Sequence, residues 1–356
     1  MEIRLFTPDI KDAWDSFVTD SEGGTCYHLS AWKDIFEKTY RHQTYYLYAI
    51  ENKQENGSDK ISGILPLVFI KSILFGTFLV SLPIFDHVGI CTDSWEAKHS
   101  LIQKTIEVAE KERVNFVEIR QANLFAPDSG GVFNDLIVKS HKITMLLELP
   151  DSSEGLWNSF KSKLRSQIKK PMKEGCEFAI GGLDQLENFY EVFSANMRDL
   201  GTPVNSKVLF RNILEGFPEQ SRIGVVLKDK RPVAAGFIIG FKEKLQIPWA
   251  SSLRRFNSLS PNMLLYWGIL EYACNNGYRI FDFGRSTPEE GTHKFKEQWN
   301  PRVIPLYWHY WVTNGEEKPG LNPDNPKFKI FIKVWRYLPL PIANILGPRI
   351  VKYLPQ

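Results

Sequence analysis

The chain has few cysteines and no paired cysteine motif. Its four cysteines lie far apart, with no C-x-x-C spacing among them: Cys26, Cys91, Cys176 and Cys274. A zinc site or a disulfide framework normally shows cysteines at short, regular spacings. We therefore expect four reduced, mostly buried thiols and no bound metal.

The chain also lacks a strong charge of either sign. It has 44 Lys and Arg against 41 Asp and Glu, which leaves a net charge of +3. So small an excess does not indicate DNA as a partner, and any basic function must come from a local cluster. With 356 residues, 43% hydrophobic and 24% charged, the composition is that of a globular protein of about two domains.

No export signal or membrane span is predicted. The start, MEIRLFTPDI, has acidic residues and lacks the apolar core of a signal peptide. The longest apolar stretch, residues 61–85, contains Pro66, Lys71 and Pro83 and is rich in β-branched residues and Phe. It therefore predicts two or three buried strands rather than a transmembrane helix. We expect a cytoplasmic protein.

Several catalytic motifs are missing. The sequence contains no Ser-His-Asp order, no H-E-x-x-H, no Walker loop and no G-x-G-x-x-G. Hydrolase, zinc-enzyme and dinucleotide-binding functions therefore have no residues to carry them. Aromatic residues are in contrast abundant at 13%. That much ring surface requires large cores or an amphipathic surface.

What is present is a pattern of elements that occurs twice. Each copy has two strands joined by a turn, then a helix, then a short strand. The first copy comprises residues 44–52, 60–72, 97–112 and 114–120, with Asn56 and Gly57 in its turn. The second comprises residues 222–229, 231–243, 262–277 and 278–284, with Lys230 in its turn.

Two pairs of residues align the copies. Gly63 and Gly236 are separated by nearly the same length of chain as Val117 and Phe281. We therefore predict an α/β (α+β) fold of two tandem units, each a mixed sheet covered by helices. The predicted division is 1–142, 143–312 and a C-terminal amphipathic segment at 313–356, with a second unit that begins in a strand over 143–150.

A basic cluster lies at SFKSKLRSQIKKPMKEG, residues 159–175. Arg165 and Lys169 are four residues apart and share one helix face, and Pro171 should end or kink that helix. A solvated surface helix is one interpretation. The other is a phosphate clamp, which the one-sided charge favours, since a merely soluble helix usually mixes signs.

A helix start follows the strand predicted at 245–252. Ser260 is a candidate N-cap and Pro261 a favourable first helical residue. The free backbone N–H groups there, together with Asn262, predict a place for an anionic part of a donor. Most capped helices bind nothing, so the pattern alone is weak evidence.

The third cluster is FDFGRSTPEEGTHKFKEQW, residues 281–299. A buried strand delivers Asp282 and Arg285 into a short polar loop, and Lys294 and Lys296 alternate around Phe295. One interpretation is that Asp282 pairs with Arg285 or caps the loop. The other is an active-site loop on a rigid scaffold.

At these residues the chain resembles the FemAB-like family of tandem GNAT-fold transferases. It is most similar to the branch associated with the PEP-CTERM/exosortase system of bacteria that export exopolysaccharide. The similarity spans almost the whole chain and is carried by KLRSQIKKPMKEG, NMRDLGTPV, the stretch from Leu259 to Trp299, LPLVFIKSILFGTFLVSLPIFDHVGI and LPLPIANILGP.

The resemblance implies transfer of an acyl or aminoacyl group to an amine of a small-molecule or lipid-linked cell-envelope precursor. The donor would be acyl-CoA or aminoacyl-tRNA, used as a co-substrate and not as a tightly bound cofactor. Two features depart from relatives: a tRNA-binding helical hairpin is missing, and residues 250–262 lack the Q/R-x-x-G-x-G/A loop that holds CoA pyrophosphate.

The resemblance also implies roles for residues. Lys296 would stabilise the developing oxyanion, and Asp282 or His293 would accept the amine proton. Substrate-binding residues would be Arg165, Lys169, Arg198, Arg285, Ser286 and Lys294, with the donor near Ser260 and Asn262. We expect Lys296→Ala to lower turnover by at least about 100-fold with little effect on folding.

Three alternatives stay open at this point. The chain could be a plain acetyl-CoA-dependent N-acetyltransferase, or a non-catalytic binding module of an export system. The C-terminal segment interleaves lysines and arginines with large apolar residues. It either packs on the second unit or lies on the anionic inner face of the plasma membrane.

Overall fold

The computed structural model describes residues 1–51, 60–72, 76–125, 131–134, 136–313 and 326–354. These residues form an α/β structure that divides into two compact units. The first contains residues 1–143, 305–321 and 353–356, and the second contains residues 144–304 and 322–352. The predicted turn at Asn56 and Gly57 lies outside the described residues.

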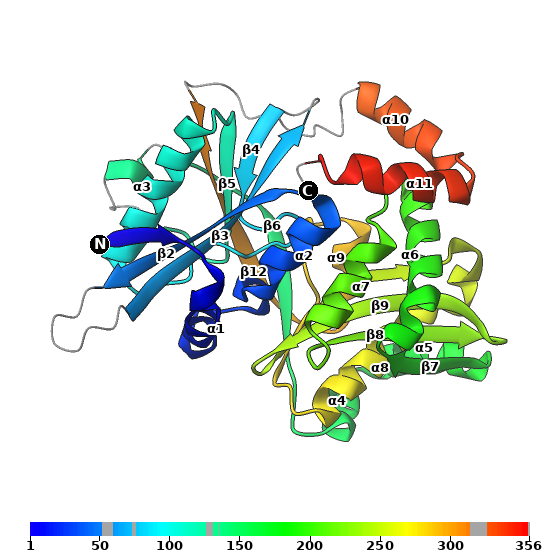
Figure 1. The fold of residues 1–356 in the computed structure, drawn as a ribbon. Helices are drawn as coiled ribbons and strands as arrows, with labels where there is room; N and C mark the ends of the chain where they lie inside the picture. Colours follow the sequence, from blue (N-terminus) through cyan, green and yellow to red (C-terminus); the bar gives the residue numbers. More distant parts are fainter. Residues whose placement is uncertain (52–59, 73–75, 126–130, 135, 314–325, 355–356) are drawn as a thin grey trace. The chain divides into compact units, whose positions relative to one another are not determined.

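The first unit is a mixed sheet with helices on both faces (Figure 1). Its strands follow the order β1-β2-β3-β4-β5-β12 and are antiparallel except for the parallel pair β4 and β5. They are β1 (Glu2–Leu5), β2 (Gln43–Glu51), β3 (Lys60–Ser72), β4 (Gly76–Val80), β5 (Phe116–Gln121) and β12 (Arg302–Val312). Its helices are α1 (Lys11–Asp20), α2 (Ala31–Tyr40) and α3 (Trp95–Lys111).

Alternate residues of β2 show which helix covers which face. Leu47 joins a core cluster with Leu101 of α3, whereas its neighbour Tyr46 stacks on Trp14 of α1, with ring centroids 5.5 Å apart. Successive strand residues point to opposite faces, so α3 and α1 cover different sides. The apolar run at 61–85 contributes β3 and β4, as predicted.

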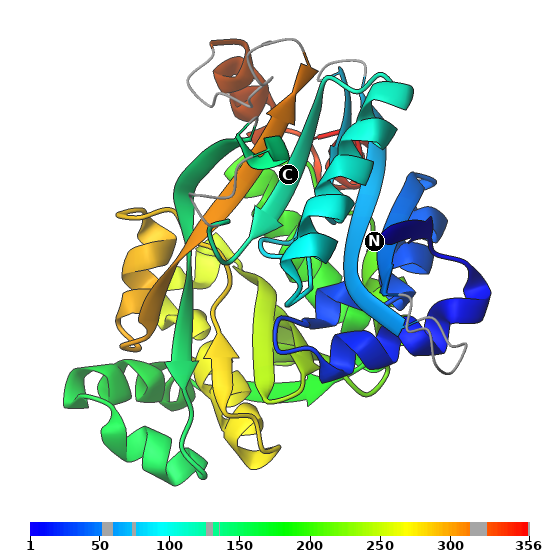
Figure 2. The same ribbon diagram turned by 90° about the vertical axis from the view of Figure 1, so that its left-hand side faces the viewer.

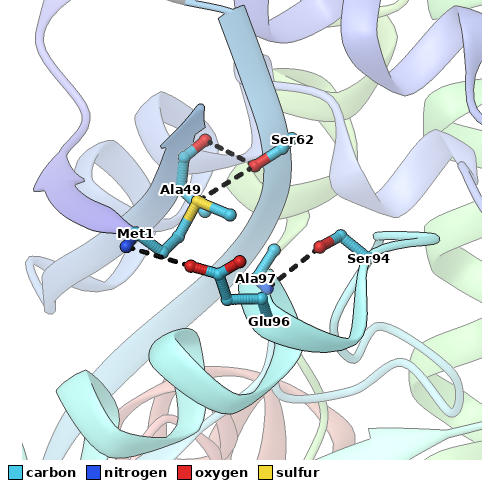
Figure 3. Close-up of polar contacts among 6 residues, drawn as sticks. All are labelled: Met1, Ala49, Ser62, Ser94, Glu96 and Ala97. Atoms are coloured by element: carbon cyan, nitrogen blue, oxygen red, sulfur yellow. Dashed lines mark hydrogen bonds and ion pairs between the residues drawn. The ribbon is translucent and has the colours of Figure 1, made fainter. Parts of the chain in front are cut away.

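Polar contacts hold the start of α3 near the first strands (Figure 3). Ser94 caps the helix by accepting from the Ala97 N–H at 3.2 Å. The Met1 amino group ion-pairs with Glu96 at 3.2 Å. The anion lies in the first turn of the helix, where a carboxylate is favoured.

The second unit has the same plan. Its strands follow the order β6-β11-β10-β9-β8-β7, and β10 and β11 are its parallel pair. They are β6 (Ile137–Glu148), β7 (Cys176–Gly181), β8 (Ser221–Lys228), β9 (Arg231–Phe241), β10 (Lys244–Ser252) and β11 (Ile280–Asp282). The helices are α4 (Ser153–Ser159), α5 (Ser162–Lys173), α6 (Leu186–Leu200), α7 (Lys207–Gly216), α8 (Pro261–Asn275), α9 (Gly291–Glu297), α10 (Pro326–Arg336) and α11 (Leu340–Val351).

Two neighbouring residues of β9 show that its helices also cover both faces. A Cβ on Gly236 would lie 3.2 Å from Ile269 of α8, whereas Phe237 packs on Phe189 of α6 and Phe210 of α7. Helix α8 therefore covers one face, and α6 and α7 the other. Figure 2 shows the sheet and its helices from the side.

The glycines that aligned the two copies in the sequence are structurally equivalent. Gly63 of β3 lies under α3, where a Cβ would be 3.2 Å from Ala97, and Gly236 of β9 lies under α8 in the same way. The order strand, two helices, three strands, helix, strand is shared by 2–121 and 176–282. The prediction of two tandem α/β units is confirmed.

The strand that completes each unit comes from the other half of the sequence. β12 pairs with β5, and β6 pairs with β11. Residues 305–312 therefore group with the first unit, and 322–352 with the second. These units differ from the predicted stretches 143–312 and 313–356, because β12 and β6 each pair with a strand from the other half of the sequence.

All four cysteines are buried thiols outside any disulfide, as the sequence predicted. Pro171 lies inside α5, which continues to Lys173, so it does not end the helix. Within the described part of the chain, no helix combines the length and the apolar character needed to cross a membrane.

Candidate active site

The loop after β11 is held by a close backbone contact. Gly284 has φ +71, and a Cβ there would lie 3.2 Å from the Ile247 carbonyl oxygen of β10. Only glycine adopts this conformation without strain, and the space beside it is also limited. Gly284 therefore brings residues 283–287 back towards β10.

Asp282 fixes the loop to the sheet. Its side chain is fully buried, and Oδ1 accepts from Thr144 Oγ1 at 2.6 Å and from the Gly284 N–H at 2.8 Å. Thr144 belongs to β6, the strand beside β11. The interpretation that Asp282 caps the loop is confirmed, and its role as a proton acceptor stays a prediction.

Lys296 holds the loop from the other side. Its ammonium donates to the Gly284 carbonyl at 2.9 Å and to the Arg285 carbonyl at 2.8 Å. The residue is only 7% exposed. The expectation that Lys296→Ala leaves folding nearly unchanged is therefore wrong, because its removal would leave two carbonyls of a buried loop without this donor.

The rest of α9 faces outward or packs on aromatic rings. Lys294 is exposed, and Phe295 lies 4.9 Å from the Tyr266 ring of α8. His293 Nδ1 accepts from the Glu289 N–H at 3.2 Å. In neutral imidazole one nitrogen accepts and the other carries the proton, so the accepting nitrogen of His293 is already engaged.

Ser286 and Asn262, both predicted as site residues, each have a buried polar atom with no hydrogen-bond partner in the described structure. Ser286 is 3% exposed, and its Oγ finds no partner within the described ranges. The same holds for Oδ1 of Asn262, in the first turn of α8. Buried polar groups are nearly always satisfied, and unsatisfied ones at a candidate site are suited to bind a ligand.

The pairing of the parallel strands β10 and β11 ends beside this loop. They pair only over Lys244–Gln246 and Ile280–Asp282, whereas β10 continues to Ser252. Beyond Gln246, no described strand pairs with β10 on the β11 side. Backbone N–H and C=O groups on such an edge can bind an extended ligand.

Helix α8 begins after β10, as predicted, at Pro261 with Ser260 in the N-cap position. However, Ser260 has φ 57 and its side chain forms no cap hydrogen bond. The predicted side-chain cap is therefore wrong. In this left-handed conformation the backbone of Ser260 still bonds the helix start, with its carbonyl accepting from the Met263 N–H at 3.0 Å.

The basic helix α5 packs against α8. Its buried residues are Leu164, Ile168 and Pro171. Arg165 is half-buried, and Lys169 is exposed with its ammonium 5.5 Å from the Trp157 ring centroid. Both cations thus lie on a helix that borders α8, and their phosphate-binding role stays a prediction.

Arg198 lies elsewhere in the second unit. It is near the C-terminal end of α6, where it ion-pairs with Asp199 at 2.7 Å and donates to the Leu338 carbonyl at 3.1 Å. The structure therefore places Arg198 against the C-terminal segment, apart from the hydrogen-bonded group of Asp282, Gly284, Arg285 and Lys296.

Two residues escaped the sequence reasoning. Thr144 anchors Asp282, and Trp299 lies fully buried beside Tyr266, with ring centroids 6.1 Å apart. Trp299 also lines a cavity of about 400 Å3 with Leu147, Pro150, Leu156 and Phe160. Burial raises the pKa of Tyr266 well above its usual range, so that phenol stays neutral.

Across the described residues, no group of three or more His, Cys, Asp or Glu is placed to hold a metal.

Comparison with known families places this site in a recognised domain. Residues 158–297 match the acetyltransferase (GNAT) domain family. The matched stretch contains α5, the β10–α8 junction, the loop after β11 and α9. A search of curated proteins found no match.

Several solved structures share the whole fold. FemX superposes with a TM-score of 0.66 at 16% identity, covering 88% of this chain and 98% of its own. A tandem GNAT protein from the clavulanic acid biosynthesis pathway gives 0.56 at 8% identity, over 89% and 99% of the two chains. A C-terminal domain from Agrobacterium fabrum, described as that of a lysylphosphatidylglycerol synthetase, gives 0.54 at 14%, over 86% and 92%. The chain therefore has a FemAB-like tandem GNAT fold.

Proposed function

We propose that this chain is an acyltransferase that moves an acyl or aminoacyl group from an activated donor to an amine. The observation that carries the proposal is the part of β10 that continues past the end of β11. It lies within the stretch that matches the GNAT domain, and the Gly284 loop and the start of α8 border it.

The edge of β10 beyond Gln246, where its pairing with β11 has ended, supports binding of an extended donor arm. Its backbone groups beyond Gln246 can pair with an amide-containing chain as an added strand would. The Asn262 Oδ1 atom and the N–H groups at the start of α8 would then hold the polar end of the donor. Acyl-CoA fits this arrangement, and an aminoacyl-tRNA 3′ end is the other donor class.

The reaction would be direct attack on a thioester or ester carbonyl. The amine nitrogen forms a bond to the carbonyl carbon, the bond from that carbon to sulfur or oxygen breaks, and the amine proton leaves. Orientation would supply much of the rate. Ser286 Oγ would donate to the substrate, and Lys296 would position the Gly284 and Arg285 carbonyls by donating to both.

Two of the three ammonium N–H donors of Lys296 are directed at loop carbonyls, so a role as oxyanion donor would require the third. For the amine proton, Asp282 and His293 each carry a hydrogen bond on a candidate accepting atom. We infer that a water or the leaving group takes this proton, and that Asp282 positions the loop.

For the acceptor, we propose an amine on a cell-envelope glycan or peptide precursor, either free or lipid-linked. The similarity of fold to FemX and to the Agrobacterium domain supports this class. The sequence resemblance to the exosortase-associated branch supports a setting in exopolysaccharide export. Arg165 and Lys169 of α5 would bind the phosphates of such a precursor.

The test is donor binding followed by transfer. Purified protein is heated with acetyl-CoA, a longer acyl-CoA or an aminoacyl-tRNA mimic, and a ligand at 100 times its Kd should stabilise it by about 2.7 kcal/mol. Mass spectrometry then follows acyl transfer to a panel of amines. Stabilisation without transfer to any amine would favour a binding module, and the absence of both would contradict the proposal.

A further inference from the structure

The C-terminal helices pack on the second unit while leaving an apolar surface exposed. Both α10 and α11 contact α6 (Figure 1). Trp335, Ala343 and Gly347 are buried there, and a Cβ on Gly347 would come within 2.8 Å of the Val204 nitrogen. The interpretation that this segment packs on the second unit is confirmed, but packing uses only part of each helix.

Helix α10 carries two parallel stripes. Ile330, Val334 and Tyr337 are spaced i, i+4, i+7 and are 64%, 58% and 81% exposed. A second i, i+4, i+7 row, of Lys329, Lys333 and Arg336, lies immediately beside the first, because each member precedes an apolar one by a single residue. Three large apolar side chains in one exposed row are unusual on a monomeric surface.

The cationic row borders a cavity of about 720 Å3. Lys329, Lys333 and Arg336 line it from α10, and Arg254 lines it from the segment after β10. The carboxylate among the lining residues is Asp199, which is already ion-paired with Arg198 at 2.7 Å. We call these five lining residues the basic groove. Among the described lining residues, cations outnumber carboxylates, and such a lining suits a phosphate group.

The groove is anchored to the body of the unit. Arg336 donates to the Leu200 carbonyl at 3.3 Å, and Ile332 lies against Gly201, whose φ of +82 ends α6. Arg198 donates to the Leu338 carbonyl just after α10. These contacts fix the rotation of α10 about its axis, which keeps the apolar row exposed and the cations at the groove.

Helix α11 adds to the exposed apolar area. Ile342, Ile345 and Leu346 are 44%, 59% and 38% exposed, whereas Ala343, Gly347 and Val351 on the next face are buried. A soluble partner protein would not require a row of cations beside the apolar row of α10. Apolar side chains flanked by Lys and Arg instead match an anionic bilayer. There the apolar side chains insert at the boundary between headgroups and acyl chains, and the cations bind headgroup phosphates.

We propose that α10 and α11 form a membrane-docking surface for anionic phospholipid, and that the basic groove binds the phosphate of a lipid headgroup. The surface is distinct from the loop after β11 and does not depend on the transfer chemistry. It would hold the protein at a bilayer as a peripheral protein, whichever substrate it uses.

The test is flotation of the full chain with vesicles of phosphatidylcholine alone and of phosphatidylcholine mixed with phosphatidylglycerol. The wild type should float only with the mixed vesicles. Each cation near the surface contributes roughly fivefold to partitioning, so Lys329→Gln, Lys333→Gln and Arg336→Gln together should weaken it about 100-fold. Ile330→Gln with Val334→Gln should weaken it at least about tenfold.

A matched control removes the same charge elsewhere. Lys11, Lys38 and Lys111 are exposed lysines that belong to neither α10 nor α11 and do not line the groove, so their triple Gln variant should bind within about twofold of wild type. Circular dichroism and thermal unfolding establish that each variant is folded.

Three results would overturn the proposal. They are wild-type protein that does not float with mixed vesicles, equal weakening by the control and groove variants, and a dimer in solution that Ile330→Gln with Val334→Gln converts to monomer. The last would assign the apolar rows to self-association. In the first of these results, binding of inorganic phosphate by the protein would make the groove a site for free phosphate.

Discussion

The ammonium nitrogen of Lys296 lies 2.9 Å from the carbonyl oxygen of Gly284. The same ammonium bonds the next carbonyl, that of Arg285. Asp282 accepts a hydrogen bond from the N–H of the same glycine. A buried cation and a buried anion therefore hold the same glycine, and the shape of the loop depends on both.

Replacing Lys296 by Met should destabilise the protein by about 2–5 kcal/mol, since two buried carbonyls each lose a donor. Urea unfolding measures this loss. Lys294→Met is the matched control: that lysine is two residues away on the same helix and exposed, so its effect should stay within about 0.5 kcal/mol. Equal stability of the two variants would show that Lys296 does not hold the loop.

Asp282 and Thr144 should behave as a coupled pair. Asp282→Ala and Thr144→Val remove the acceptor and the donor of one 2.6 Å hydrogen bond, and a double-mutant cycle should give a coupling energy of about 0.5–3 kcal/mol. We expect both single variants to reduce transfer by similar factors, because each loosens the same loop. Loss of transfer only in Asp282→Ala, with stability unchanged, would instead identify Asp282 as the proton acceptor.

Ser286→Ala should separate binding from stability. The Ser286 hydroxyl is buried without a hydrogen-bond partner in the described structure, so removing it should leave stability equal or slightly higher. Turnover should fall roughly tenfold or more if this hydroxyl donates to the substrate.

The control for Ser286 is Ser221→Ala. Ser221 is equally buried but donates to the Phe217 carbonyl at 2.7 Å, so its removal should cost about 1 kcal/mol of stability. Thermal unfolding and a transfer assay should therefore rank the two variants in opposite orders. The same order in both assays would argue against a substrate role for Ser286.

The first unit should lose stability in mild acid through His309. Burial lowers the pKa of His309 to about 4, and its Nε2 accepts from the Phe125 N–H at 3.4 Å. The folded pKa is below that of the unfolded chain, so the stabilisation is complete above about pH 6.5 and is lost as the pH falls towards 4.

Between pH 7 and pH 5 this loss should amount to about 2 kcal/mol. Urea unfolding at the two pH values measures it, and the His309→Gln variant should show a correspondingly weaker pH dependence. The control is His99→Gln, at a half-buried histidine of α3. This variant should retain the wild-type difference in stability between the two pH values. An identical pH dependence of wild type and His309→Gln would exclude this histidine as the cause.

Much of the fold could be predicted because it follows local periodicity. The helix over 262–277 and the strands at 222–229 and 231–243 were evident from their apolar patterns, and Gly63 and Gly236 marked equivalent positions in two copies. At each glycine a Cβ would lie only 3.2 Å from a side chain of the covering helix, which is closer than ordinary packing. The loop after β11 was likewise evident as a polar segment behind a buried strand.

The limits of the sequence are clearest at α9. Lys294 and Lys296 are two positions apart, so their side chains point about 200° from each other around the helix. That spacing implies opposite faces but does not say which face is buried. The packing of Phe295 and Trp299 on Tyr266 decides it, and those rings come from distant parts of the chain.

The sequence thus contains the repeated elements, the glycines that let helices approach strands, and the residue types of the loop, since each depends on neighbours within a few turns. Only the tertiary structure shows that β6 and β12 exchange units, that Lys296 is buried, and that Arg198 faces the C-terminal helices. These features depend on contacts between residues far apart in the chain, which no local pattern encodes.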